Sequence, residues 1–134
     1  MPGLRGGSFG PGVWMLAVCF LAMSVPIETT YSWRLGLTEP YYLIKLVGWL
    51  LLAFGAMQLR VNRASVGLAF LAAGWGWFAA NFWRAVADRL SRIAMGQSLP
   101  LGSIELWFAG SCLLISLLGL CWSLALTFRR DNPN

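Results

Sequence analysis

The chain has 134 residues, of which 58% are hydrophobic and 11% are charged. A soluble domain carries about 25% charged residues, so this composition excludes an ordinary water-soluble globule and predicts an all-α integral membrane protein. The formal net charge of +5 comes from Lys and Arg residues scattered over every loop and tail, which argues against a nucleic-acid-binding surface.

Histidine is absent, and the three cysteines, Cys19, Cys112 and Cys121, all lie inside apolar runs. Without imidazole the chain lacks a common ligand of haem, copper, non-haem iron and zinc, and it lacks the commonest general base. Three cysteines without a Cys-x-x-Cys pair are expected to behave as small hydrophobes. We therefore expect no metal site, no catalytic residue, no enzymatic activity and no cofactor of the chain's own.

The first predicted span covers residues 11–27 and follows a Gly- and Pro-rich arm at residues 1–10. At about 17 residues, this span is at the lower limit for crossing about 30 Å of hydrocarbon. Residues 28–40 form the predicted first loop. The second span is expected over residues 41–59, where Lys45 is close enough to one end for its ammonium group to reach the interface.

The basic turn Arg60–Arg63 is so short that the second and third helices are expected to form an antiparallel hairpin. The third span is predicted over residues 64–83, and an amphipathic interfacial helix continues from it over residues 84–95. Gly96 and Pro100 are expected to end that helix. The predicted architecture is a single membrane domain of four transmembrane helices with an interfacial extension after the third.

The third span carries small residues and aromatic residues on opposite sides at about 100° per residue. The small set is Ala69, Ala72, Ala73, Gly76 and Ala80, and the aromatic set is Trp75, Phe78 and Phe82. We expect the small face to pack against the fourth helix. The aromatic face is expected to point outward, as a candidate contact for partner subunits, lipid, or a carotenoid or chlorophyll-type pigment, although ordinary packing is the alternative.

The fourth span is predicted over residues 104–128, before a polar tail at residues 129–134. One side of it repeats small or polar residues at spacings of three and four. These are Ala109, Cys112, Ser116, Gly119 and Ser123, with Glu105 and Thr127 at the two ends. Such a seam predicts a helix-packing face, because small side chains allow close approach and hydroxyl groups form hydrogen bonds.

The predicted spans hold no charged residue in their central parts, and Glu28, Lys45 and Glu105 all lie near ends. We therefore expect no proton relay or coupling-ion site near the middle of the membrane. Gln58 and Asn81 are the strongest remaining polar groups in or near the spans, and both are expected to form interhelical or interfacial hydrogen bonds.

These patterns favour a non-catalytic accessory or assembly subunit of a larger membrane complex, of the energy-transducing photosynthetic or respiratory kind. Its expected partners are other membrane subunits and lipid, and not nucleic acid. The alternative is a small oligomeric transporter or channel in which the polar seam of residues 105–127 faces a shared axis. The expected location is a bacterial inner or intracytoplasmic membrane, with both termini in the cytoplasm.

Overall fold

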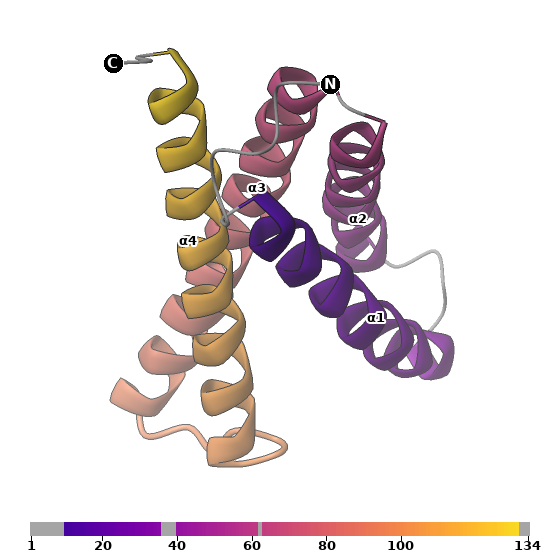
Figure 1. Cartoon of the computed structure of the whole chain (residues 1–134). Helices are drawn as coiled ribbons and strands as arrows, with labels where there is room; N and C mark the ends of the chain where they lie inside the picture. The colour runs from indigo at the N-terminus through magenta and orange to yellow at the C-terminus, as the bar shows by residue number, and fades with distance from the viewer. Residues whose placement is uncertain (1–9, 36–39, 62, 132–134) are drawn as a thin grey trace.

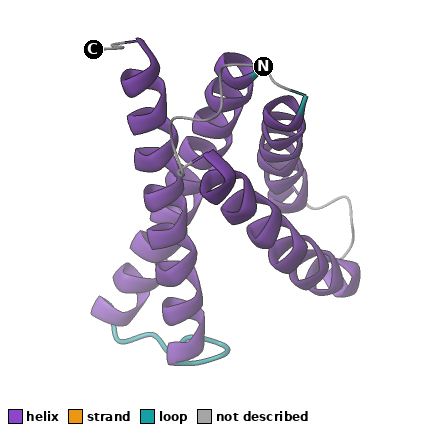
Figure 2. Cartoon of the chain, viewed as in Figure 1, coloured by secondary structure: helices purple, strands orange, loops and turns teal. Residues whose placement is uncertain are grey.

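The structure is a computed structural model that describes residues 10–35, 40–61 and 63–131. Those residues form four helices and no strand, as Figures 1 and 2 show: α1 (Gly10–Leu35), α2 (Pro40–Arg60), α3 (Ala64–Ala94) and α4 (Ser103–Asp131). Each helix is long and apolar enough to cross a membrane. This confirms the predicted all-helical class with four apolar helices, and it indicates a multi-pass membrane protein. The predicted arm falls outside the described residues except for Gly10, as do the last three residues of the tail.

The first helix is longer than predicted, because α1 continues to Leu35 instead of ending at residue 27. Glu28 therefore lies inside a helix and not in a loop. Pro26 removes one amide donor from the helix, yet the helix continues. The hydroxyl group of Thr30 donates a hydrogen bond of 2.7 Å to the carbonyl oxygen of Pro26 one turn earlier.

The predicted interfacial segment is a direct continuation of α3, which runs unbroken to Ala94. In Figure 1, α4 returns antiparallel to α3, and the α3–α4 hairpin reaches further down than α1 and α2. Gly96 and Gly102 both have positive φ, 72° and 67°, in the loop between the two helices. Glycine adopts this conformation without steric cost, so these two positions allow the tight reversal.

The α2–α3 hairpin packs by placing a glycine of one helix against a large side chain of the other. A Cβ atom at Gly55 would lie 2.8 Å from the amide nitrogen of Leu71, which shows how closely the two backbones approach. The four pairs are Gly48–Phe78, Gly55–Leu71, Leu59–Gly67 and Leu52–Gly74. In each pair the two residues are equally far from Arg63 in the sequence, so the hairpin keeps one register along its length.

The α3–α4 interface uses the same pairing of a large residue with a small one. A Cβ atom at Gly119 would lie only 2.4 Å from the Trp75 ring, so the indole occupies the space that a side chain at residue 119 would need. Gln97 is the midpoint, in the sequence, of two contacts between these helices. One is the contact of Trp75 with Gly119, and the other is the ion pair of Arg89 with Glu105. The two helices therefore stay in register from the core to their loop.

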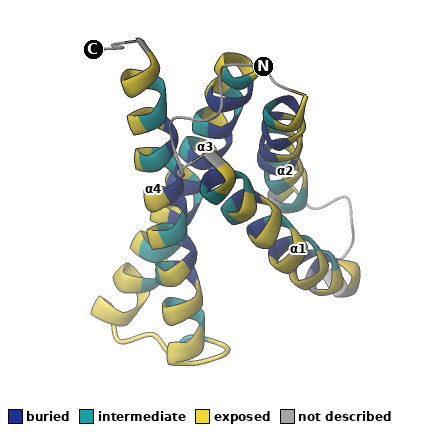
Figure 3. Cartoon of the chain, viewed as in Figure 1, coloured by how far each residue is buried: buried dark blue, intermediate teal, exposed yellow. Residues whose placement is uncertain are grey.

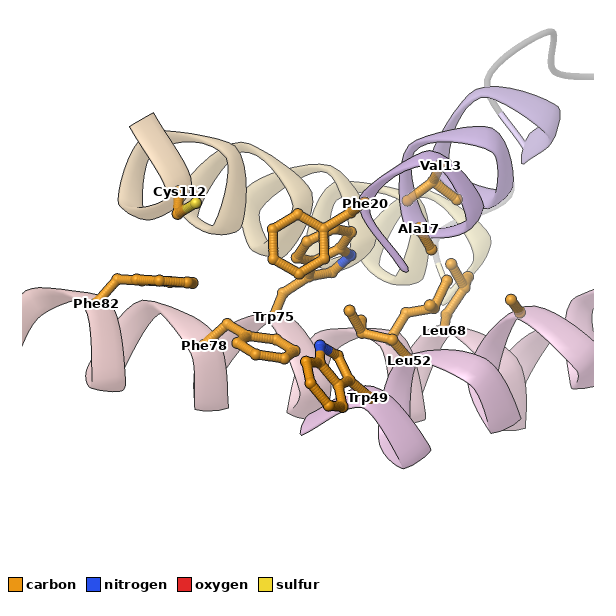
Figure 4. Close-up of a cluster of buried hydrophobic side chains, with 12 residues drawn as sticks. Val13, Ala17, Phe20, Trp49, Leu52, Leu68, Trp75, Phe78, Phe82 and Cys112 are labelled. Atoms are coloured by element: carbon orange, nitrogen blue, oxygen red, sulfur yellow. The ribbon is translucent and has the colours of Figure 1, made fainter. Parts of the chain in front are cut away.

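Helix α1 crosses the other three helices obliquely (Figure 1) and joins them through the aromatic core. The ring of Phe20 packs edge-on against both Trp75 and Phe78, each at 5.2 Å between centroids. Figure 4 shows these rings meeting where α1, α3 and α4 approach one another. Near its start, α1 places Gly12 against Trp122 of α4, which repeats the pairing of glycine with a large side chain.

Candidate interface for a partner helix

The aromatic side chains of α3 form the core of the protein, and the outward orientation expected for them is wrong. Trp75, Phe78 and Phe82 are 0%, 2% and 9% exposed. Phe78 stacks on Phe82 with centroids 5.9 Å apart, and the Phe78 and Trp75 rings both contact Phe20. None of the three rings is available on the surface of this fold to a pigment, a lipid or a partner subunit.

The small residues of α3 lie on its outer side, so their expected packing against α4 within the chain is also wrong. Ala69, Ala73 and Ala80 are exposed, while Ala72 and Gly76 are half-buried. No atom lies within 4 Å of the position that a Cβ atom would take at Gly76. We call these five residues the alanine face. Figure 3 shows the exposed and buried sides that alternate along the helices.

The reason for this reversal lies in the shape of the seam on α4. The five seam residues, Ala109, Cys112, Ser116, Gly119 and Ser123, are all buried. Gly119 has no side chain, and the Trp75 indole occupies the space beside it, which an alanine on α3 would leave unfilled. Large side chains of α3 therefore pack into the seam of α4, as knobs enter holes.

The hydroxyl groups of the seam bind their own helix. Ser116 donates to the carbonyl oxygen of Cys112 at 2.7 Å, and Ser123 donates to that of Gly119 at 2.8 Å. These bonds satisfy the hydroxyl donors inside the α3–α4 interface. Within this chain, the seam is a packing surface covered by α3.

A charged pair between α1 and α2 is the contact that the sequence pattern missed. The ammonium group of Lys45 donates a hydrogen bond to the Glu28 carboxylate, with side-chain exposures of 26% and 11%. The sequence pattern places Glu28 in a loop, away from Lys45 in the second span, whereas the structure places both in helices. Their position in facing helices neutralises both charges in a largely buried place, where an isolated charge would be costly.

Two further polar contacts flank this pair and extend it along both helices. The Trp49 indole donates a hydrogen bond of 3.1 Å to the hydroxyl group of Ser24, and Thr29 shares a hydrogen bond of 3.4 Å with Tyr42. Ser24 and Glu28 are one turn apart on α1, and Lys45 and Trp49 are one turn apart on α2. The polar zipper of Ser24, Glu28, Lys45 and Trp49 therefore joins the two helices over successive turns.

Among the described residues, neither amide side chain makes an interhelical hydrogen bond, which was one of the two kinds of contact expected. Asn81 donates to the carbonyl oxygen of Trp77 in its own helix at 2.8 Å. Gln58 is buried, and its side-chain oxygen has no hydrogen-bond partner among the described residues. The interhelical contact comes from Trp77, whose indole donates to the carbonyl oxygen of Ile44 at 2.7 Å.

The contacts described above are packing contacts, hydrogen bonds and ion pairs within the chain. Within the described ranges, no group of three or more His, Cys, Asp or Glu residues is placed to hold a metal ion. In each ion pair the two side chains bind each other. The alanine face leaves a surface to which another helix can come close. No protein-family model, curated protein or solved structure matches this chain.

Proposed function

We propose that this chain is a non-catalytic accessory subunit of a membrane-embedded complex, and that it binds a transmembrane helix of another protein through the alanine face of α3. The single observation that supports this most is the division of α3 into two sides. One side carries the core of the fold, with Trp75 and Leu71 both 0% exposed. The other side is built for close helix contact but has no contact within the chain at Gly76.

Helix association in lipid depends on close packing and not on the removal of apolar surface from water. Small residues let two backbones approach, and this gain in contact is what drives association. The exposed side of α4 offers a useful contrast, because it presents large side chains such as Leu114 and Leu118, at 64% and 65% exposure. The large side chains on the exposed side of α4 are suited to contact with lipid chains, whereas the alanine face is suited to contact with another helix.

Charge favours a different protein over a second copy as the occupant. Arg84 lies one turn beyond Ala80 and is exposed, and none of the ion pairs found among the described residues includes it. Two copies inserted in the same orientation and related by a two-fold axis at this face would bring the two Arg84 side chains together, and like charges repel. We therefore infer a partner helix with small residues on one side and a carboxylate at the depth of Arg84.

The first test replaces alanine by leucine on two faces. Ala73→Leu and Ala80→Leu are expected to remove the partner from the purified complex, because the larger side chain holds the helices apart. Ala125 is an exposed residue of α4, and Ala125→Leu makes the same chemical change away from the alanine face. This variant is expected to retain the partner. The measurement is the subunit composition after mild detergent extraction from the native membrane, with thermal unfolding of each isolated variant.

Two results would contradict this proposal. One is a wild-type chain that purifies only as a monomer or homodimer under conditions that preserve other membrane complexes. The other is equal loss of the partner in Ala73→Leu and Ala125→Leu. Unfolding midpoints that stay close to wild type in all three variants show that any loss of the partner is not loss of the fold, because exposed substitutions typically change stability by only about 0.5 kcal/mol.

The type of host complex is a separate part of the proposal. We further propose a photosynthetic or respiratory complex in a bacterial inner or intracytoplasmic membrane, because the sequence offers helix-packing faces but no catalytic or ligand-binding set. Both termini of the chain are proposed to lie in the cytoplasm. The alternative is a small oligomeric transporter or channel in which the polar seam of residues 105–127 faces a shared axis. Because α3 covers that seam, with Ser116 and Ser123 both 0% exposed, a path along it would require α3 and α4 to separate.

A further inference from the structure

A depression of about 150 Å³ lies at the end of the α3–α4 hairpin, where the loop joins the two helices. Its size and its charged lining suit a small polar group. Side chains from α3, the loop and α4 line it: Asp88, Arg89, Arg92, Leu99, Pro100 and Glu105.

Two cationic and two anionic side chains of the depression are joined in ion pairs. Arg89 pairs with Glu105 at 3.3 Å across the two helices, and Arg92 pairs with Asp88 at 3.0 Å within α3. Glu105 also accepts a hydrogen bond of 2.8 Å from the backbone amide of Leu101, which ties the loop to the start of α4. The site is therefore neutral as a whole but strongly polar at close range.

Both guanidinium groups keep donors for a ligand. Among the described residues, Arg89 Nη1 donates to the carbonyl oxygen of Ala85, and Arg92 Nε donates to the Asp88 carboxylate. Arg89 Nε lies 3.3 Å from the Glu105 carboxylate but forms no hydrogen bond with a described residue. Arg89 Nη2 and both terminal nitrogens of Arg92 have no partner in this set. A guanidinium group with free terminal donors binds phosphate oxygens well, because its planar fork matches their spacing. The neighbouring carboxylates favour an ammonium group beside that phosphate.

With residues 64–83 taken as the part of α3 inside the hydrocarbon, this depression lies at headgroup depth. Residues 64–83 are the uncharged part of α3, and Trp75 lies close to their midpoint. From Trp75 to Arg89 there are fourteen residues, or about 21 Å at 1.5 Å per residue. The hydrocarbon extends about 15 Å from the bilayer midplane, and the polar headgroups occupy the next several ångströms.

We infer that this depression binds the headgroup of a zwitterionic phospholipid of the phosphoethanolamine type. The phosphate accepts hydrogen bonds from Arg89 and Arg92, and the ammonium group lies against Asp88 and Glu105. Leu101 and Ile104, at 62% and 71% exposure, provide apolar surface at the same end of the hairpin for the attached acyl chains. This site is separate from the alanine face, so it does not depend on the proposed partner helix.

The test uses the full chain in detergent and measures lipid adducts by native mass spectrometry as phosphatidylethanolamine is titrated. Arg92→Gln is expected to weaken binding at least fivefold, because it removes two phosphate donors from a residue whose ion pair is largely exposed. Arg129→Gln removes the same charge at the far end of α4 and is expected to bind lipid as wild type does. Diacylglycerol, which has no phosphate, is expected to bind much less.

Several results would overturn the inference. Equal weakening in Arg92→Gln and Arg129→Gln would show a general charge effect. Tighter binding of phosphatidylglycerol than of phosphatidylethanolamine would show that the carboxylates do not select an ammonium group. Displacement of the lipid by millimolar inorganic phosphate would identify a free anion as the ligand. A Glu105→Gln variant that still prefers phosphatidylethanolamine over phosphatidylglycerol as strongly as wild type would also contradict it.

Discussion

Replacing Gly119 by leucine is expected to lower the free energy of unfolding by about 3 kcal/mol or more, because the site has no room for a side chain. A Cβ atom there would lie 2.4 Å from the Trp75 ring, and the indole is 0% exposed in the centre of the bundle. The ring cannot move aside without disturbing Phe20, which packs against it from α1. Thermal unfolding in detergent, followed by circular dichroism, measures the change.

The matched control is Gly76→Leu, which makes the same substitution one residue away from Trp75 on the alanine face. No atom lies within 4 Å of a Cβ atom at Gly76. The free energy of unfolding of the isolated variant is therefore expected to stay within about 0.5 kcal/mol of the wild-type value. The same variant is expected to lose its partner helix. Comparable destabilisation by both substitutions would mean that the two sides of α3 are assigned incorrectly.

Replacing Glu28 by glutamine is expected to destabilise the chain by about 3 kcal/mol, because it leaves Lys45 charged and without its partner. We take the lower end of the range for broken buried pairs, since the Lys45 side chain is 26% exposed and water screens part of its charge. The loss is expected to fall on the contact between α1 and α2. Thermal unfolding, with protease cleavage of α1 as a second readout, measures it.

Two further variants test that explanation. Glu28→Gln combined with Lys45→Met is expected to be more stable than Glu28→Gln alone, because no unpaired charge remains. Asp88→Asn breaks an ion pair whose side chains are 49% and 59% exposed, and it is expected to cost about 0.5 kcal/mol or less. If the double variant is less stable than Glu28→Gln alone, uncompensated charge is not the cause.

Much of the fold could be predicted from the sequence because hydrophobic runs and turn residues are local signals. The expected second span, residues 41–59, agrees with α2 to within one residue at each end. The expected third span and its extension together cover residues 64–95, and α3 ends at Ala94. A hydrophobic run limited by a basic turn needs no knowledge of tertiary contacts.

The end of α1 could not be predicted in this way, because it depends on a distant residue. Glu28 ends the apolar run in the sequence, and a charge at that place normally indicates a loop. In the structure Lys45 lies opposite Glu28 and pairs with it, so the helix continues for almost two more turns. Only the pairing of α1 with α2 contains that information.

The periodicity of α3 separates its residues into two faces, but the environments expected for those faces are wrong. Helical periodicity separates Ala73 from Trp75, but it does not say which side faces the interior. The answer depends on what the neighbours offer. The glycine at residue 119 of α4 accepts the Trp75 indole, and Phe20 of α1 contacts Trp75 and Phe78. The sequence pattern contains the glycine, but not the register that brings it to residue 75.

Site-specific photo-crosslinking tests most directly whether the alanine face binds a partner helix. A photoreactive amino acid replaces Ala73 on α3 or, as a control, Leu118 on the exposed side of α4, and the native membrane is irradiated. We expect that Ala73, and not Leu118, gives one defined adduct with a different membrane-spanning protein, and that Ala80→Leu abolishes it. Adducts only with lipid or with a second copy of the chain, or the same adduct from both positions, would show that the alanine face does not bind a partner helix.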